Sequence, residues 1–325
     1  MRSLSGVKPT GSLHIGNYFG AIKQFIKLQN KYEGFYFVAD YHSLNTGIEP
    51  KTLQKASLEI ISNYLALGLD PDKSTIFLQS QVPEVAELTL LLGNITPMGL
   101  LQRAHSYKDK IAKDIQPNHG LFSYPLLMAS DILLYDSDLV PVGRDQKQHL
   151  EITRDIAIKF NNTYNQKVFK IPEPLILDNL AVVKGTDGRK MSKSYGNVIE
   201  IFAPKKKLKK QVMGIITDSI PLEQPKDPDK CNVFSIYKLF SSKEEQEKMR
   251  SNYLGGNYGY GHAKLALYNK ILAYFERCRI KKQKLEANPQ YVKEVLEIGS
   301  SKARNIAIKK ISKVKKVMGL IGNIY

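Results

Sequence analysis

The chain has 325 residues, of which 42% are hydrophobic, so it is long enough for one large domain or two ordinary ones. Its two cysteines, Cys231 and Cys278, exclude a disulfide framework and a four-ligand zinc site. No apolar run approaches the ~20 residues that span a bilayer, and no apolar signal segment follows Met1, so we expect a cytoplasmic protein without membrane contact. The 48 Lys+Arg against 31 Asp+Glu give a formal charge of +17, which predicts a polyanionic partner such as nucleic acid, unless a lysine-rich proteome raises the charge of every chain.

The N-terminal segment has the pattern of a strand, an anion-binding loop and a helix. Residues 2–7 read as a short buried strand, the next loop contains Pro9 and Gly16, and helical periodicity runs through residues 18–28. Such an arrangement aims backbone N–H groups at an anion. The glycine spacing differs from the dinucleotide-binding pattern, and no acidic residue stands where that pattern has its ribose anchor.

Strands and helices then alternate up to about residue 183. The predicted strands cover residues 34–38, 74–79, 138–142 and 180–183, and the predicted helices cover 51–67, 84–92, 100–113, 121–135 and 147–161. This alternation predicts an α/β fold, a doubly wound parallel sheet that forms a Rossmann-like nucleotide-binding domain over residues 1–184. Polar residues follow the strand at 34–38, and ligands bind at the carboxyl ends of such parallel strands.

The second half of the chain has helical patterns without intervening strands. They cover residues 205–215, 233–240, 242–253, 261–282 and 289–318. We therefore predict a C-terminal all-helical domain at 198–288, and we expect the last helix, within 289–325, to pack back on the first domain. The lysines of residues 300–316 read as a solvated helix face, unless they follow a bound backbone.

The loop at residues 185–197 joins the two halves and is rich in glycine, lysine and hydroxyl side chains. Glycine-rich loops are often mobile and close over ligands. Lysine ammonium groups neutralise a polyphosphate, while hydroxyls and backbone N–H groups supply directed hydrogen bonds. The alternative interpretation of the loop is a solvated basic surface.

Two motifs carry a resemblance to a known family. Leu13-His-Ile-Gly-Asn17 and, far downstream, Lys190-Met-Ser-Lys-Ser194 resemble the two signature motifs of the class I aminoacyl-tRNA synthetases. The segments at 124–135 and 140–149 are similar to those of the tryptophan-specific bacterial branch, and the likeness extends over essentially the whole chain. Lys8 and Leu4 depart from residues common in that branch, which leaves their roles open.

The resemblance implies a reaction and its partners. ATP, with Mg²⁺, would activate L-tryptophan to tryptophanyl-adenylate, and the aminoacyl group would pass to tRNA(Trp), with release of pyrophosphate and AMP. The region 198–288 would bind the tRNA anticodon, and the protein would be a homodimer without a metal held by its own side chains. Chemistry of this kind needs alignment and charge stabilisation more than a protein nucleophile.

By the resemblance, four residues carry catalysis: Lys190, Lys193, Lys110 and His14. The lysines would hold the pyrophosphate, although Lys110 has the alternative of an exposed helix lysine and His14 that of a helix cap. The nucleotide contacts are assigned to the two motif loops and to the strand ends between them, at Lys8, Pro9, Thr10, Gly16, Asn17, Gly143, Arg144, Asp145, Ala181, Lys190, Met191, Ser192, Lys193 and Ser194.

Asp131 is the predicted specificity residue. An acid within an apolar helix needs a partner, and the indole N–H is a donor without acceptor ability, which suits a carboxylate. The alternative is a core acid paired with a protein lysine. The remaining tryptophan contacts are assigned to Tyr124 and Gln146 for the amino group and, around the ring, to Met128, Val140, Val142 and His42.

Three other functions stay open at this point. A tyrosyl-tRNA synthetase has the same fold and chemistry, but its pocket must satisfy a phenolic hydroxyl. A catalytically silent RNA-binding paralogue would have lost the lysines of the second motif, which this chain retains. A class I-like nucleotidyltransferase for a small molecule would lack a helical region of this length.

Overall fold

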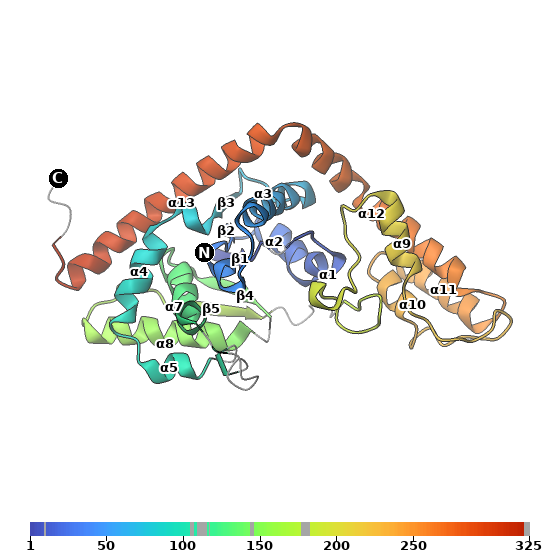
Figure 1. Cartoon of the computed structure of the whole chain (residues 1–325), viewed down its shortest axis with the longest axis horizontal. Helices are drawn as coiled ribbons and strands as arrows, with labels where there is room; N and C mark the ends of the chain where they lie inside the picture. The colour runs from blue at the N-terminus through green and yellow to red at the C-terminus, as the bar shows by residue number, and fades with distance from the viewer. Residues whose placement is uncertain are drawn as a thin grey trace.

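The computed structural model describes residues 1–9, 11–104, 107–108, 116, 118–143, 146–176 and 183–321. Within these residues, five strands form one sheet: β1 (Arg2–Val7), β2 (Glu33–Val38), β3 (Ser74–Leu78), β4 (Leu139–Val142) and β5 (Glu173–Ile176) (Figure 1). Neighbouring strands pair in parallel, in the order β3-β2-β1-β4-β5. The doubly wound parallel sheet predicted from the alternation of elements is confirmed.

Helices cover both faces of the sheet. Those of the α/β half are α1 (Ile15–Asn17), the π-helix η1 (Tyr18–Ile22), α2 (Lys23–Leu28), the 3-10 helix η2 (Tyr41–Thr46), α3 (Pro50–Leu67), the 3-10 helix η3 (Gln79–Gln81), α4 (Glu84–Gly93), α5 (Met98–Gln102), α7 (His119–Leu133) and α8 (Lys147–Thr163). The helical half contains the 3-10 helix η5 (Lys193–Tyr195), α9 (Lys205–Met213), α10 (Asn232–Tyr237), α11 (Lys243–Leu254), α12 (Tyr260–Ala287) and α13 (Pro289–Val317).

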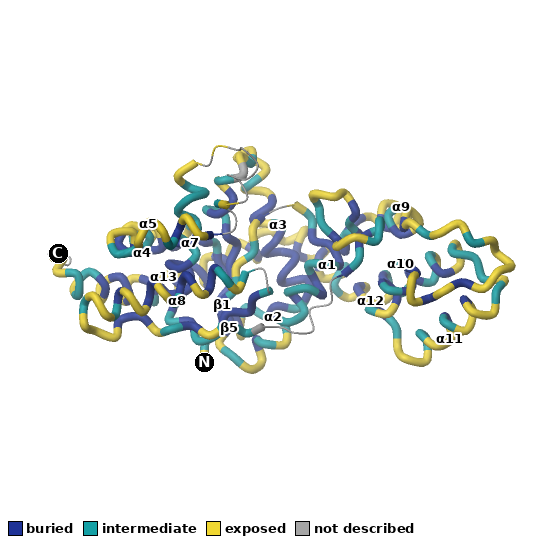
Figure 2. The backbone as a smooth tube through the Cα atoms, turned by 90° about the horizontal axis from the view of Figure 1, so that it is seen from below, coloured by how far each residue is buried: buried dark blue, intermediate teal, exposed yellow. Residues whose placement is uncertain are grey.

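The alternation of side chains along β2 separates two hydrophobic cores. Phe35 and Phe37 point to a core shared with α4, α7, α8 and α13. Tyr36 and Val38 point to the opposite face, where the core runs through α2 and α3 into the helical half. Figure 2 shows buried residues concentrated along the sheet and its neighbouring helices, while α11 carries much exposed surface. Because successive residues of a strand face opposite sides, one buried strand supplies both cores.

The order of the strands reverses between β1 and β4, which are neighbours in the sheet although β2 and β3 lie between them in the chain. In an open parallel sheet, ligands bind at such a switch point, outside the carboxyl ends of the strands. Here those ends are Val7 of β1 and Val142 of β4. The residues that follow these two ends are therefore the first place to look for a site.

The last helix, α13, lies back across the α/β half (Figure 1). It packs on β3 and α4, and its Arg304 Nε donates to Glu84 at 2.9 Å. Gly299 approaches β3 so closely that a Cβ there would lie 2.0 Å from the carbonyl oxygen of Ile76, so a larger residue would force the helix away. The domain boundaries proposed from the sequence stay a prediction.

Three parts of the predicted element order differ from the structure or lie outside its described residues. The fifth strand is Glu173–Ile176, which the sequence analysis missed because Pro174 interrupts its pattern; β5 is an edge strand, where proline is tolerated. The strand predicted at 180–183 falls outside the described residues except for Val183, which has no strand geometry. The helix predicted over 100–113 is interrupted, because α5 ends at Gln102 and residues 103–104 are not helical. Residues 107–108 are helical again, and residues 105–106 and 109–113 lie outside the described part.

No helix within the described ranges is both long enough and apolar enough to cross a membrane.

Candidate active site

A cavity of about 380 Å³ opens at the switch point between β1 and β4. Its walls come from the ends of these two strands, from β2 and η2, and from one face of α7. The lining includes all seven residues predicted to contact tryptophan: His42, Tyr124, Met128, Asp131, Val140, Val142 and Gln146. Lys8 and Gly143, predicted to contact the nucleotide, line the same cavity. The fold thus brings two predicted sets of residues together at one edge of the sheet.

Asp131 lies on α7 with only 3% of its surface exposed, and two side chains, those of His42 and Gln79, lie against its carboxylate. Gln79 Nε2 donates to both oxygens, at 2.8 and 2.9 Å, and His42 Nε2 lies 2.9 Å from Oδ2. Burial raises the pKa of Asp131, and the bonds from His42 and Gln79 oppose this shift. The alternative partner considered for a core acid, a lysine, is not the partner found for Asp131 here; a histidine and a glutamine take that place.

Gln79 is a residue that the sequence analysis missed. It is 1% exposed, and its Oε1 accepts from the backbone N–H of Tyr41 at 3.1 Å, so the donor end of its amide faces Asp131. Gln79 directly follows β3, at the carboxyl edge where polar residues of parallel strands gather. The rule that drew attention to the polar residues after β2 could have identified Gln79 as well. The predicted strand at 74–79, however, included this residue as its last one.

A second polar chain crosses the cavity wall between α7 and α8. His149 Nδ1 lies 3.0 Å from Gln146 Oε1, and the Tyr124 hydroxyl is hydrogen-bonded to His149 Nε2. A carbonyl oxygen only accepts, so Nδ1 carries the hydrogen of the bond to Gln146, while Nε2 faces the Tyr124 hydroxyl. His149 thereby orients the two residues predicted to bind an amino group. It too was missed, although it stands one helical turn after Gln146.

The rest of the cavity wall is apolar. Val140 and Val142 of β4 are 3% and 5% exposed, and Met128 and Ile132 of α7 lie in the same lining. Hydrophobic side chains with a few placed polar groups are the usual lining of a small-molecule pocket. An apolar ring with one N–H fits such a wall, because among the described residues the lining carries one buried carboxylate, that of Asp131.

The first motif loop begins α1 with a reciprocal cap. His14 Nδ1 accepts from the N–H of Asn17 at 3.3 Å, and Asn17 Oδ1 accepts from the N–H of His14 at 3.2 Å. The predicted cap role of His14 is therefore present in the structure. Burial, with the nearby Lys193 charge, lowers the pKa of His14 to about 4, so His14 is neutral near pH 7.

The second motif loop is organised around Asn197. The Asn197 side chain accepts from the N–H of Ser192 at 2.7 Å and donates to Asp187 Oδ1 at 2.6 Å and to the carbonyl oxygen of Lys190 at 3.1 Å. Gly196 has a φ of 66°, in the left-handed region that favours glycine. These bonds brace a loop that the glycine content alone predicted to be mobile.

The two motif loops lie against each other. A Cβ on Gly16 would lie 3.3 Å from Met191 Cβ, and a Cβ on Gly11 would lie 3.8 Å from Lys193 Nζ. The N–H of Ile15 donates to the carbonyl oxygen of Ile199 at 3.0 Å, which ties the first loop to the chain beyond the second. The missing side chain of Gly16 allows Met191 to approach the first loop this closely.

Lys193 lies where the two loops meet. Burial lowers the pKa of Lys193, and the charges of Glu59 and Glu200 oppose this shift. Burial also lowers the pKa of Lys8. Ser192 Oγ and Ser194 Oγ are 2.8 Å apart, while the side chain of Lys190 is exposed to solvent. The ammonium group of Lys193, on a loop with two hydroxyls and beside the start of α1, favours an anion.

Several predicted nucleotide and catalytic residues lie outside the described residues: Thr10, Lys110, Arg144, Asp145 and Ala181. Pro9 precedes the first of them and is buried. Among the residues that the structure does describe, no group of three or more histidine, cysteine, aspartate or glutamate side chains is placed to hold a metal ion.

Comparison with known sequences finds relatives over the whole chain. The sequence model of the family described as tRNA synthetases class I (W and Y) matches residues 1–276. The chain is 63% identical over 324 residues to the tryptophan–tRNA ligase of Fusobacterium nucleatum, which covers 100% of this chain and 99% of the relative.

Comparison with solved structures gives the same result. The tryptophanyl-tRNA synthetase of Campylobacter jejuni, in complex with ADP and tryptophan, superposes with a TM-score of 0.94 at 51% identity and covers 98% of this chain and 100% of the other. The corresponding enzyme of Mycoplasma pneumoniae has a TM-score of 0.80 at 31% identity and covers 98% of both chains.

Proposed function

This chain belongs to the class I tRNA synthetases for tryptophan and tyrosine, and we infer on that basis that it ligates tryptophan to tRNA at the expense of ATP. One observation carries the choice of amino acid. A carboxylate stands on the wall of an otherwise largely apolar cavity at the switch point, held by His42 and Gln79. It offers an acceptor to a ligand whose flat apolar surface carries a single N–H.

In the proposed complex, the Asp131 carboxylate accepts the indole N–H, and Met128, Val140 and Val142 pack against the ring. A hydroxyl that donates its hydrogen keeps acceptor capacity on its oxygen, so Tyr124, which His149 orients, suits the substrate ammonium together with Gln146. The tryptophan carboxylate then points toward Lys8 and Gly143, at the end of the cavity nearest the strand ends.

In the first step, a carboxylate oxygen of tryptophan forms a bond to the α-phosphorus of ATP, and the bond from that phosphorus to the bridging oxygen breaks, releasing pyrophosphate. Lys193 and Lys190 neutralise the charge that collects on the leaving group. Mg²⁺ accompanies the triphosphate as part of the substrate and screens its charge. The neutral His14 holds the start of α1 in place rather than supplying a proton.

In the second step, a hydroxyl of the terminal ribose of the tRNA attacks the carbonyl carbon of the adenylate, and AMP leaves. The tRNA is the one for tryptophan, and the helical region 198–288 is its anticodon-binding part. We place the enzyme in the cytoplasm, where ATP and tRNA are available. The resemblance also implies a homodimer, and exposed apolar side chains such as Leu90 on α4 and Met98 on α5 are of the kind that a subunit contact buries.

Exchange of pyrophosphate into ATP, run with each of the twenty amino acids in turn and without tRNA, tests this function. We expect exchange with tryptophan far above that with tyrosine or phenylalanine, and tRNA-dependent release of AMP when tRNA(Trp) is added. Equal exchange with tyrosine would reassign the amino acid. No exchange with any amino acid would reassign the chain to a catalytically silent RNA-binding protein. Light scattering of the same sample tests the homodimer.

A further inference from the structure

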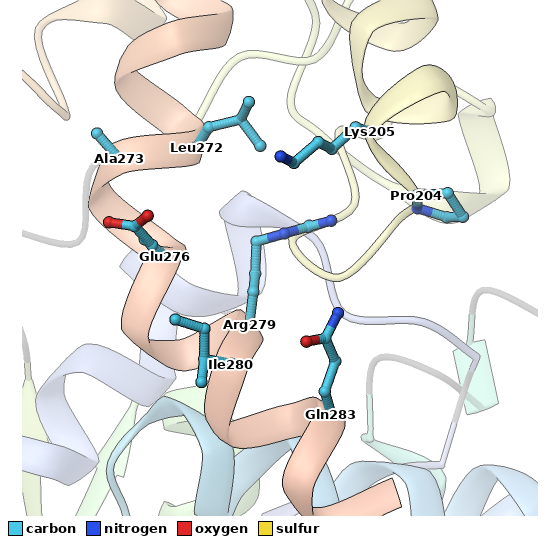
Figure 3. Close-up of a pocket in the computed structure, with 8 residues that line it drawn as sticks. All are labelled: Pro204, Lys205, Leu272, Ala273, Glu276, Arg279, Ile280 and Gln283. Carbon is cyan, nitrogen blue, oxygen red and sulfur yellow. The ribbon is translucent and has the colours of Figure 1, made fainter.

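A second cavity, of about 680 Å³, lies between the start of α9 and the middle of α12, away from the site described above. We call it the α9–α12 groove. Its lining includes Lys205 of α9 and, from α12, Leu272, Glu276, Arg279, Ile280 and Gln283. Figure 3 shows Lys205 and Arg279 reaching into the gap between the two helices, and the lining also contains one acid, Glu276 of α12. The groove is therefore bordered by two cations whose heads lie in the same space.

The helix on one side of the groove is strongly basic. The nine residues of α9, Lys-Lys-Lys-Leu-Lys-Lys-Gln-Val-Met, contain five lysines and no acid. All five lysines are exposed, and Leu208 and Val212 are the buried residues that attach the helix. Lysines four apart on a helix repel each other, so this composition lowers the stability of α9. A gain in helix stability does not explain it.

The lysines of α9 differ from the cations of α13 in their partners. On α13, Lys302, Arg304, Lys310 and Lys315 form ion pairs with Glu33, Glu84, Asp136 and Glu87 of the α/β half. These charges attach the helix. On α9, the ion pairs found among the described residues include one lysine, Lys207, which binds Glu200 at 2.8 Å. The positive charge of α9 is thus left facing solvent beside the groove.

Arg279 supplies a fixed donor at the other wall. Its Nη1 donates to the carbonyl oxygen of Ile201 and its Nη2 to that of Ala203, at 2.6 Å for the second bond. These bonds hold the guanidinium in place and use two of its five N–H groups. A pre-positioned guanidinium with further donors suits a phosphate.

We propose that the α9–α12 groove binds the phosphate backbone of the tRNA, with Lys205 and Arg279 on either side of the strand and Lys206, Lys209 and Lys210 extending the contact along α9. The proposal rests on the function above, since it locates the partner of that function. A protein partner fits less well, because lysine is depleted in the cores of protein interfaces, whereas lysine and arginine make most phosphate contacts. Such contacts fix the position of the RNA without reading its sequence.

A triple variant, Lys205→Gln, Lys206→Gln and Lys209→Gln, tests the proposal in the full-length chain. Glutamine keeps the helix propensity and removes the charge. The matched control replaces three exposed lysines of α13, Lys293→Gln, Lys309→Gln and Lys316→Gln, so that both variants lose the same charge. A third variant, Lys205→Arg, Lys206→Arg and Lys209→Arg, keeps the charge of the groove. The readouts are the Kd for tRNA at several salt concentrations and the tRNA-free pyrophosphate exchange with tryptophan.

The groove variant should bind tRNA at least ~10-fold more weakly at low salt, and the slope of log K against log salt should fall in size by roughly 2 to 3. The arginine variant should match the parent, the α13 control should keep the parent's slope, and all variants should exchange pyrophosphate normally. If the parent protein shows no pyrophosphate exchange, the proposed function is refuted, whereas the proposal for the α9–α12 groove is judged by tRNA binding alone. An unchanged slope in the groove variant, or an equal loss in the α13 control, overturns the proposal. So does a groove variant that binds tRNA normally but no longer binds poly-glutamate, which would indicate an acidic protein instead.

Discussion

Replacing Asp131 with asparagine tests the carboxylate that the structure places on the cavity wall. Gln79 Nε2 lies 2.8 and 2.9 Å from the two carboxylate oxygens. Gln79 Oε1 accepts from the Tyr41 N–H, so a flip of the Gln79 side-chain amide would break that hydrogen bond. In either orientation, the asparagine N–H₂ would therefore meet the N–H₂ of Gln79. The asparagine must rotate, and its carbonyl oxygen moves away from the position where the indole N–H would reach it.

The expected loss follows from the bond that disappears. A hydrogen bond to a charged group contributes ~1.5–3 kcal/mol, so the efficiency of tryptophan activation should fall by roughly ten- to a hundredfold. Tyrosine and phenylalanine should gain relative to tryptophan, because tryptophan loses a contact that they never made. The fold should survive. Burial raises the pKa of Asp131, so its charge weakens the folded state as the pH rises above about 4, the ordinary value for an aspartate.

The assay is pyrophosphate exchange with the three amino acids, beside thermal melts at several pH values. The melting temperature of the asparagine variant minus that of the parent should increase as the pH rises above about 4. Gln79→Met serves as a companion variant, because it leaves the carboxylate and removes its donor. Its KM for tryptophan should rise, with a smaller effect on kcat. If Asp131→Asn melts normally and keeps the parent's preference for tryptophan, Asp131 is a structural acid and the reasoning is refuted.

Three further predictions concern the motif loops. Lys193→Ala should slow single-turnover activation by about a hundredfold, or ~3 kcal/mol, while tryptophan binding stays near the parent's, and an unchanged rate would contradict the role. The pKa of His14 in the folded state is about 4, below its ordinary 6.5, so the free energy of unfolding should fall as the pH drops from 6.5 toward 4. His14→Asn still caps α1 and should reduce that fall, as measured by urea titrations at several pH values. Equal curves for the variant and the parent would argue against this reasoning. Asn197→Ala leaves Ser192 N–H without its partner, so the melt should show a loss of about 1–3 kcal/mol and activation should slow; a parent-like melt and rate would exclude the brace.

Much of the fold could be predicted from hydrophobic periodicity. The first strand has the predicted bounds, Arg2–Val7, and α3 begins one residue before the prediction and ends where expected. Continuous apolar runs and amphipathic stripes are local signals, and they are clear in these elements because positions that are buried must be apolar. The fifth strand could not be predicted in the same way, because Glu173–Ile176 has four residues and a proline, and only its pairing with β4 makes it a strand.

For the site, the sequence by itself determined two motif loops rich in glycine and charge and one acid, Asp131, within an apolar helix, since each is visible within a few consecutive residues. The tertiary structure alone decided that Gln79 and His149 orient the predicted residues, and that Gly16 lies against Met191. It also separated the lysines of α13, which are partly neutralised by distant acids, from those of α9, which face a groove. The physical reason is that hydrogen bonds and ion pairs between remote residues depend on how the elements pack, and periodicity along the chain carries no record of that packing.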